Sequence, residues 1–432
     1  MKEKKLGLWS STSLVTGNMI GSGIFLLPAT LATIGSISLL GWLISGAGAW
    51  ALARVFVKFS VMVPATSGGP YVFTRRGLGD FAGFLVAWGY WISIWCSNAA
   101  IAIAFVGYLS VFVPPLSEHP FWALLTGLGV VWLLVWINTR GIKNAGIFQV
   151  VTTLLKIAPL LAIGLMGLFF IRPENFIPFN LSGMSDFRAI TMAATLTFYA
   201  YMGLECATIP AADVKNPEKT IPKATFLGLI LTLLVYVLCS VAVMGVVPAM
   251  TLQHSNAPLA DAAQLMWGEK ARYLVAFGAM VSTLGALNGW ILVQGQIPAA
   301  IARDRLFPAI FSKLNQRGVP TFSIILSCIL LSLLMSMNYA NGLVKAYEFA
   351  LLLASMTALI AYLFTSVAYS IVHIETSGWT STSWKTLVLA FIAFFFSVWA
   401  IAGSGKDIVY WGFILLMAGL PFYAWRKINN LK

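Results

Sequence analysis

A short glycine-rich stretch, residues 17–25, reads Gly-Asn-Met-Ile-Gly-Ser-Gly-Ile-Phe and lies inside an apolar segment long enough to span a bilayer. Glycine is poorly tolerated inside a helix, and backbone groups left free at membrane depth are costly unless they line a cavity. A second half-helix that begins here would offer free N–H groups to an anionic group, beside the Ser22 hydroxyl. An unbroken helix in which Gly21 and Gly23 allow close packing is the structural alternative.

A second apolar segment is interrupted by residues 201–205, Tyr-Met-Gly-Leu-Glu, which places a carboxylate at membrane depth. The other acidic residues lie in loops or near the ends of apolar segments. An ionisable group at this depth is costly and indicates a function by default. Because burial disfavours the charged form of a carboxyl group, Glu205 could exchange protons or bind a cation. A neutral glutamate that packs between helices through hydrogen bonds is the alternative.

The basic counterpart is Lys156, which lies in a further apolar segment within the sequence Thr-Thr-Leu-Leu-Lys-Ile-Ala-Pro. A membrane lysine usually extends its side chain to the interface, but Lys156 is too far from either end of its segment to do so easily. Two uses are open: a fixed or protonatable positive charge beside the first interruption, in place of a sodium ion, or an ion pair with Glu205. We favour the first.

Aromatic side chains accompany these groups inside the apolar segments. Most membrane aromatics face lipid or the interface, but Tyr199 lies shortly before Glu205, and Trp290 follows a run of small residues. Aromatic faces attract desolvated ammonium or guanidinium groups by about 2 kcal/mol or more. A cationic amine would therefore suit a cavity lined by these rings. The other aromatic candidates inside the segments are Tyr90, Trp91, Trp95, Phe198 and Tyr362.

The elements that must position these residues are membrane-spanning helices. Hydrophobic residues make up 59% of the 432-residue chain and charged residues only 9%, whereas about a quarter of a soluble domain is charged. A helix needs about 20 apolar residues to cross a bilayer, and the sequence predicts an all-α membrane protein with about twelve such segments. Their approximate limits are 8–33, 37–62, 79–112, 120–139, 144–171, 185–210, 221–248, 271–302, 319–338, 343–371, 384–403 and 408–426.

The order of the segments predicts an internal repeat. The first five segments begin on one side of the membrane and the next five on the other, as a five-plus-five inverted repeat requires. The interruptions in segments one and six occupy matching positions, which favours a secondary transporter. We expect one transmembrane domain over residues 1–432, with a first repeat at 1–171, a second repeat at 185–371 and two last helices at 384–426.

The basic residues predict the orientation of the chain. Most of the 27 lysines and arginines fall in connections on the side of the N-terminus. This bias predicts a multi-pass protein of the cytoplasmic (inner) membrane with both termini in the cytoplasm.

Several other classes of protein are disfavoured. The basic residues form no patch with interleaved aromatics, which argues against a nucleic-acid partner. The four cysteines and three histidines have neither disulfide nor metal-site spacing, and no cofactor is expected. A membrane enzyme is disfavoured because metal-ligand clusters and a nucleophile elbow are missing from the sequence, while a channel or a sensor stays open.

Five motifs, in chain order, resemble those of one transporter superfamily. They are the glycine-rich stretch followed by Leu27-Pro28, then Ser67-Gly-Gly-Pro70-Tyr71, Gly203-Leu-Glu205, Val214-Lys-Asn-Pro217 with Ile221-Pro222, and Asp304-Arg-Leu-Phe-Pro308. The chain is identified as a member of the amino acid, polyamine and organocation superfamily. It most resembles the bacterial basic amino acid and polyamine antiporters, such as the arginine/agmatine antiporter. The resemblance implies a leucine-transporter-like fold with broken helices 1 and 6, and a homodimer built on the last two helices.

The resemblance also implies roles in substrate binding for residues at matching positions. Ser22 and Gly23 would receive the substrate carboxylate, and carbonyl groups near Met19 and Met202 would receive its amino group. Asn98 would contact the distal part of the substrate.

Gating roles follow in the same way. Trp290 would form the middle gate, and Tyr90, Glu205 and Tyr362 would form the inner gate. Glu205 would also be the proton-sensitive group.

Three departures from the antiporter pattern bear on the substrate. Tyr199 replaces the tryptophan that stacks on a guanidinium group, and Ser93 and Ile94 replace an alanine and a cysteine beside the distal pocket. Lys156 replaces a small apolar residue, as in proton-coupled and facilitative members of the superfamily. We therefore expect an exchanger of cationic amino acids or their decarboxylated amines that works by alternating access. Proton-coupled uptake of a broader amino acid set, with Lys156 and Glu205 handling the proton, is the alternative.

Overall fold

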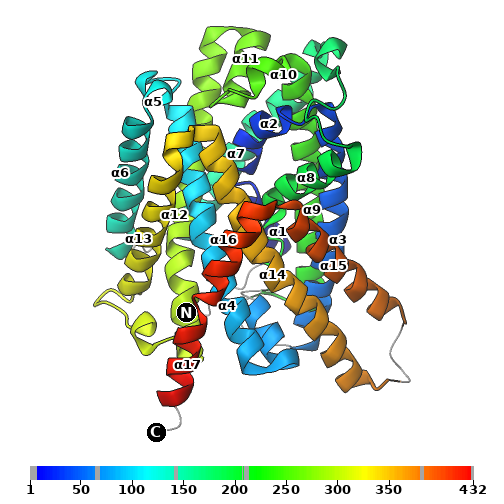
Figure 1. Ribbon diagram of the computed structural model, residues 1–432, viewed down its shortest axis with the longest axis vertical. Coiled ribbons are helices and arrows are strands. Elements are labelled where there is room, and N and C mark those ends of the chain that lie inside the picture. Colours follow the sequence, from blue (N-terminus) through cyan, green and yellow to red (C-terminus); the bar gives the residue numbers. More distant parts are fainter. Residues whose placement is uncertain are drawn as a thin grey trace.

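The computed structural model describes residues 7–63, 69–140, 145–206, 208, 214–379 and 384–429, and for residues 145–155 and 341 it describes the backbone alone. These residues form a bundle of helices, and they include no β-strand (Figure 1). The α-helices are α1 (Leu8–Met19), α2 (Gly23–Ala32), α3 (Leu39–Met62), α4 (Pro70–Leu109), α5 (Pro115–Glu118), α6 (Pro120–Thr139), α7 (Ala145–Gly167), α8 (Asp186–Phe198), α9 (Pro217–Val246), α10 (Ala249–Leu252), α11 (Pro258–Trp267), α12 (Glu269–Arg303), α13 (Thr321–Asn338), α14 (Leu343–Ser377), α15 (Trp384–Gly403), α16 (Lys406–Met417) and α17 (Leu420–Asn429). The short 3-10 helices are η1 (Ser36–Ser38), η2 (Leu168–Phe170), η3 (Pro173–Phe176), η4 (Tyr199–Tyr201), η6 (Ala309–Ser312) and η7 (Tyr339–Asn341).

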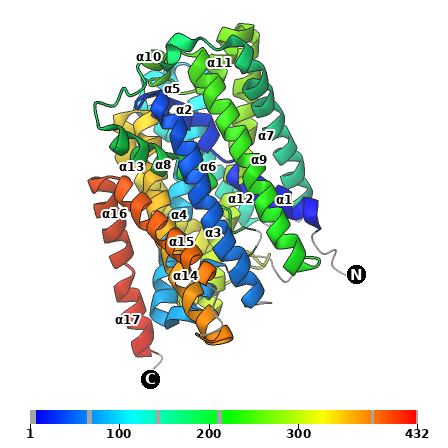
Figure 2. The same cartoon turned by 90° about the vertical axis from the view of Figure 1, so that its right-hand side faces the viewer.

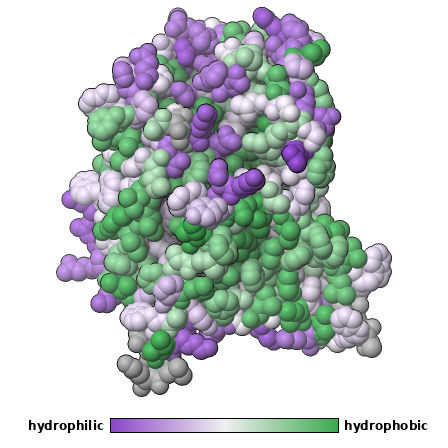
Figure 3. Space-filling model, in the orientation of Figure 1, coloured by the Kyte–Doolittle hydropathy of each residue, from purple (hydrophilic) through white to green (hydrophobic). Residues whose placement is uncertain are grey.

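The helices have the length and composition of membrane spans. Among the described residues, ten helical segments are long and apolar enough to cross a bilayer. Helices α7 and α8 lie at the other two of the twelve expected segments. Large apolar side chains also lie on the outer surface, such as Phe391 and Phe413. Figure 3 shows a broad apolar area on the lower part of one face, below a more hydrophilic upper part. The chain is a multi-pass membrane protein.

Both predicted interruptions are confirmed. Helix α1 ends at Met19, Ile20 leaves the helical region with ψ of 77°, and α2 begins at Gly23. Helix α8 ends at Phe198 and passes through η4 into an extended backbone at Met202. Gly203 then has φ of +102°, a left-handed conformation that favours glycine. Segments one and six are therefore broken near the middle of the bundle.

The third and the last segments differ from the sequence expectation. The third segment begins at Pro70 rather than near residue 79, because α4 continues across a kink at Gly79, where φ is +84°. The last segment consists of α16 and α17, which are separated at residues 418–419. Figure 2 shows this pair at one edge of the bundle.

Long helices surround the two breaks. Helix α4 packs against α14 and α12, and α14 also contacts α2 and η4. Helix α9 packs against α1 and α7. Side chains from α4, α9, α12 and α14 therefore reach the non-helical backbone of segments one and six.

Candidate functional site

The two breaks face each other at very short range. A Cβ atom added to Gly23 would lie 2.9 Å from the Cβ atom of Ala200, which is closer than side chains normally approach. Only glycine lets the first turn of α2 approach η4 this closely. On the same side, the Ser22 hydroxyl lies 3.1 Å from the Tyr199 hydroxyl. A hydrogen bond between side chains therefore links the two broken segments.

Tyrosine hydroxyls satisfy the carbonyl groups near the first break. Tyr236 of α9 donates to the Met19 carbonyl oxygen at 2.6 Å, and Tyr347 of α14 donates to that of Ser22 at 3.0 Å. One turn further along α2, Tyr108 of α4 donates to the Phe25 carbonyl oxygen at 2.8 Å. The Met19 and Ser22 carbonyl groups also accept from the Gly21 and Phe25 N–H groups. Together these donors satisfy the non-helical backbone at a depth where the bilayer supplies no water.

The N–H groups at the start of α2 are in a different situation. Those of Gly23 and Ile24 have no hydrogen-bond partner among the residues that the structure describes. The first N–H groups of a helix carry a partial positive charge and attract anions. The start of α2 therefore presents free N–H donors, and the binding of a substrate carboxylate there stays a prediction.

A narrow cavity of about 30 Å³ lies at the junction of the two breaks. A water molecule needs about 10–15 Å³ of such space, so the cavity has room for water but not for an amino acid in this conformation. All the predicted substrate contacts except Asn98 line it, together with three of the four predicted gate residues. The cavity-lining residues among these predictions are Met19, Ser22, Gly23, Tyr90, Ser93, Tyr199, Met202, Glu205 and Trp290.

Glu205 closes one part of this cavity through two hydrogen bonds. Tyr90 of α4 donates to its Oε1 atom at 2.5 Å, and Tyr362 of α14 donates to its Oε2 atom at 2.7 Å. All three side chains are buried. No lysine or arginine forms an ion pair with Glu205 among the described residues. The expected inner-gate residues thus lie together, and the carboxylate is held by neutral donors from two other helices.

Lys156 lies beside the first break and outside the lining of the cavity. Its side chain is 1% exposed, and its Nζ atom lies 3.4 Å from the Ile20 carbonyl oxygen, to which it donates. The described residues include no ion pair between Lys156 and Glu205. Lys156 thus lies beside the first break, and the role of its charge there stays a prediction.

Asn98 points away from the cavity toward α12 and α13. Its Nδ2 atom donates to the Gln294 Oε1 atom at 2.6 Å, and the Gln294 Nε2 atom donates to the Cys328 Sγ atom at 2.8 Å. The Asn98 Oδ1 atom is buried without a partner in the part of the chain described. In this conformation Asn98 lies outside the lining of the cavity, and its predicted substrate contact stays a prediction.

Several residues of the site were not expected from the sequence. Ser97 and Ile101 line the cavity from α4, and the Tyr199 hydroxyl lies 3.5 Å from the Ser97 carbonyl oxygen. Tyr236 and Tyr347 donate to carbonyl groups of the first break, and Gln294 accepts from Asn98. Their contacts join residues that are distant in the chain, so local sequence carries no signal for them.

Comparison of the sequence with models of protein families identifies the family of the chain. The model of the family described as amino acid permease matches residues 6–424. The chain belongs to this family. This result confirms the superfamily expected from the motifs, and the family consists of membrane transporters.

Curated relatives cover nearly the whole chain. The cadaverine/lysine antiporter of Escherichia coli K12 is 31% identical over 99% of this chain and 96% of its own length. The putrescine transporter PotE of Haemophilus influenzae is 30% identical over 98% of this chain and 97% of its own length. The putative arginine/ornithine antiporter of Bacillus subtilis is 30% identical, with 97% of this chain and 96% of its own length covered.

Proposed function

We propose that this permease-family transporter exchanges cationic amino acids for related amino acids or for their decarboxylated amines. The observation that carries the proposal is the composition of the cavity at the two breaks. Glu205 is the carboxylate in its described lining, which includes no lysine or arginine. Tyr90, Tyr199 and Trp290 add aromatic faces that attract ammonium groups. The curated relatives carry cadaverine, lysine, putrescine, arginine or ornithine in their names.

The substrate is proposed to bind along the junction of the breaks. Its carboxylate would receive hydrogen bonds from the N–H groups at Gly23 and Ile24, which lack partners among the described residues. Its amino group would donate to the Met202 carbonyl group, since Tyr236 already donates to that of Met19. Its cationic end would lie against the rings of Tyr199 and Trp290. Because the cavity is too small for an amino acid, the lining has to open before binding.

Glu205 is proposed to link substrate binding to the gate. An ionised carboxylate accepts hydrogen bonds from both Tyr90 and Tyr362, and so ties α4 and α14 to the second break. Protonation of one oxygen atom turns it into a donor and weakens one of these two bonds. A proton or a substrate ammonium group at Glu205 would therefore release the tyrosines, which gives a physical basis for alternating access.

The wider organisation forms part of the same proposal. The chain is proposed to lie in the bacterial inner membrane as a homodimer, with both termini in the cytoplasm. Residues 1–171 and 185–371 would be the two inverted repeats, and residues 384–426 would form the last two helices. The two breaks occupy matching places in these repeats, which supports the assignment.

Transport by the purified full-length protein in proteoliposomes tests the proposed function. The vesicles are left empty or are loaded with lysine, cadaverine, arginine or leucine, and the entry of labelled lysine is followed with and without an inward proton gradient. We expect entry only into vesicles loaded with a cationic amino acid or amine. Proton-driven entry into empty vesicles would overturn exchange, and equal entry into leucine-loaded vesicles would overturn the substrate class.

A further inference from the structure

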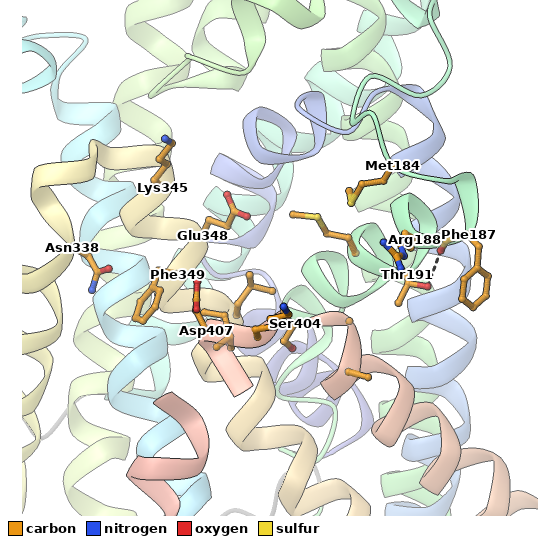
Figure 4. Close-up of a pocket in the computed structure, with 17 residues that line it drawn as sticks. Met184, Phe187, Arg188, Thr191, Asn338, Lys345, Glu348, Phe349, Ser404 and Asp407 are labelled. Carbon is orange, nitrogen blue, oxygen red and sulfur yellow. Dashed lines mark hydrogen bonds between the residues drawn. The ribbon is translucent and has the colours of Figure 1, made fainter. Parts of the chain in front are cut away.

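A second, wider cavity lies away from the two breaks. It measures about 610 Å³ and lies between the start of α8, the start of α14 and the connection between α15 and α16 (Figure 4). The Arg188, Lys345, Lys406 and Asp407 side chains that line it are exposed. Water solvates exposed charges, so this cavity needs no charged ligand to satisfy them. The N–H groups that lack partners among the described residues lie instead at the first break.

The Ser22 side chain does not cap its own helix. Ser22 immediately precedes α2, at the position where a serine hydroxyl normally accepts from an N–H group two or three residues further on. It makes no such bond. Its hydroxyl lies instead 3.1 Å from the Tyr199 hydroxyl, which belongs to the second break. The N–H groups of Gly23 and Ile24 thus stay without a partner in the described part of the chain.

Tyr199 places two chemically different groups at the junction of the breaks. Its side chain is buried and lines the cavity there. The ring offers an aromatic face to an ammonium group. The hydroxyl has one hydrogen atom to donate, and the acceptors near it are the Ser22 hydroxyl oxygen and, at 3.5 Å, the Ser97 carbonyl oxygen. Both acceptors are neutral, so a charged acceptor would hold this hydrogen atom more strongly.

A carboxylate at the start of α2 would be such an acceptor. Its two oxygen atoms offer about four lone-pair sites for hydrogen bonds. Gly23 and Ile24 supply two N–H donors from the first break, and the Ser22 hydroxyl lies beside them. The Tyr199 hydroxyl adds a donor from the second break. A diamine has no carboxylate, and so it leaves the bond between Ser22 and Tyr199 in place.

We propose that the Tyr199 hydroxyl distinguishes amino acids from their decarboxylated amines. The inference rests on the proposed function, in which a substrate carboxylate binds at the start of α2. The hydroxyl turns from Ser22 to the carboxylate of a bound amino acid, and so joins the two breaks through the substrate. When a diamine binds, the hydroxyl stays on Ser22 and the ring alone contacts the ligand. The two exchanged substrates thus leave the breaks linked in different ways.

Tyr199→Phe tests the proposal, because it removes the hydroxyl and keeps the ring. Labelled cadaverine bound to the purified full-length protein in detergent is displaced by unlabelled lysine, arginine, cadaverine or agmatine. We expect the variant to bind lysine and arginine about five- to tenfold more weakly, since a charge-assisted hydrogen bond is about twice as strong as the neutral bond that it replaces. Cadaverine and agmatine should change by less than about twofold, since the ring remains. A purely structural role of the hydroxyl would weaken all four alike.

Controls separate this inference from the proposed function. Tyr339→Phe removes a buried hydroxyl that has no partner in the described residues, and should leave all four affinities unchanged. Equal effects of Tyr199→Phe on amino acids and amines, or unchanged binding of lysine and arginine, would overturn the inference and leave the proposed function standing. A wild-type protein that binds none of the four compounds would overturn the proposed function, and the inference with it.

Discussion

At the scale of single residues, Glu205 joins the cavity at the two breaks to the helices that surround it. Its two oxygen atoms accept from Tyr90 and Tyr362, which belong to different helices. Its carboxylate also lines the cavity at the two breaks. One proton or one ammonium group at this position therefore changes hydrogen bonds on three elements at once.

Glu205→Gln removes the charge and the titrating group while it preserves the shape of the side chain. We expect exchange of labelled lysine to slow roughly ten- to a hundredfold, because a hydrogen bond to a charged group contributes about 1.5–3 kcal/mol. The remaining exchange should vary less with pH than that of the wild type, because no carboxyl group titrates at this position. Glu269→Gln alters an exposed carboxylate at the start of α12 and should exchange at the wild-type rate. A Glu205→Gln protein with the wild-type rate and pH profile would refute the role of the carboxylate.

Lys156 carries a positive charge and also donates a hydrogen bond to the Ile20 carbonyl oxygen. Two substitutions distinguish between these roles. Lys156→Gln retains an N–H donor without the charge, and Lys156→Met retains neither. If the positive charge beside the break is required, both variants should exchange labelled lysine roughly tenfold more slowly or worse, because a charged hydrogen bond is about twice as strong as a neutral one. Wild-type exchange by Lys156→Gln would show that the hydrogen bond alone suffices. Lys270→Met, at an exposed position, is the matched control.

At the scale of elements, the breaks are stabilised from outside their own segments. Helices α9, α14 and α4 each supply one tyrosine hydroxyl to a carbonyl group at or near the first break. These hydroxyls add to the backbone hydrogen bonds that the Met19 and Ser22 carbonyl groups accept from the Gly21 and Phe25 N–H groups. The breaks thus depend on the packing of the long helices.

Tyr347→Phe tests this dependence. It removes the tyrosine donor of the buried Ser22 carbonyl group, which still accepts from the Phe25 N–H group. The folded protein should therefore lose about 0.5–1.5 kcal/mol of stability, the contribution of one hydrogen bond. Tyr339→Phe is the matched control, because the Tyr339 hydroxyl is equally buried but has no partner in the described residues. Melting temperatures of the two purified variants should therefore differ, with Tyr347→Phe the lower. Equal melting temperatures would contradict the proposed support of the break.

The sequence predicts the elements of this fold better than the contacts between them. The glycines near Ser22 identify the first break, and Gly203 together with the ionisable Glu205 identifies the second. Glycines and ionisable groups are both costly inside a membrane helix. The kink at Gly79 was not predicted, because a glycine shortly after Arg75 and Arg76 is equally typical of the end of a loop. The partner of Asn98 was missed because Gln294 lies in a distant helix. Contacts of this kind depend on how the helices pack, which hydropathy does not encode.

At the scale of the whole molecule, the proposed orientation has its own test. The four native cysteines are buried, so a membrane-impermeant maleimide added to intact cells should report only on introduced cysteines. We expect Lys270→Cys to be labelled from outside, whereas Lys313→Cys should be labelled only after the membrane is opened, because basic connections remain in the cytoplasm. Both lysines are exposed. The reverse pattern would invert the proposed topology.

The central claim is that substrate exchange passes through the junction of the two breaks. Gly23→Ala adds a Cβ atom that would lie 2.9 Å from the Cβ atom of Ala200, and so forces α2 away from η4. Gly129→Ala adds the same atom to α6, where it meets open space. The measurement is the initial rate at which labelled lysine enters lysine-loaded proteoliposomes that contain equal amounts of folded protein. We predict wild-type exchange by Gly129→Ala and at least a roughly tenfold loss by Gly23→Ala, since strain of about 1.4 kcal/mol already has that effect. Wild-type exchange by Gly23→Ala would contradict the account.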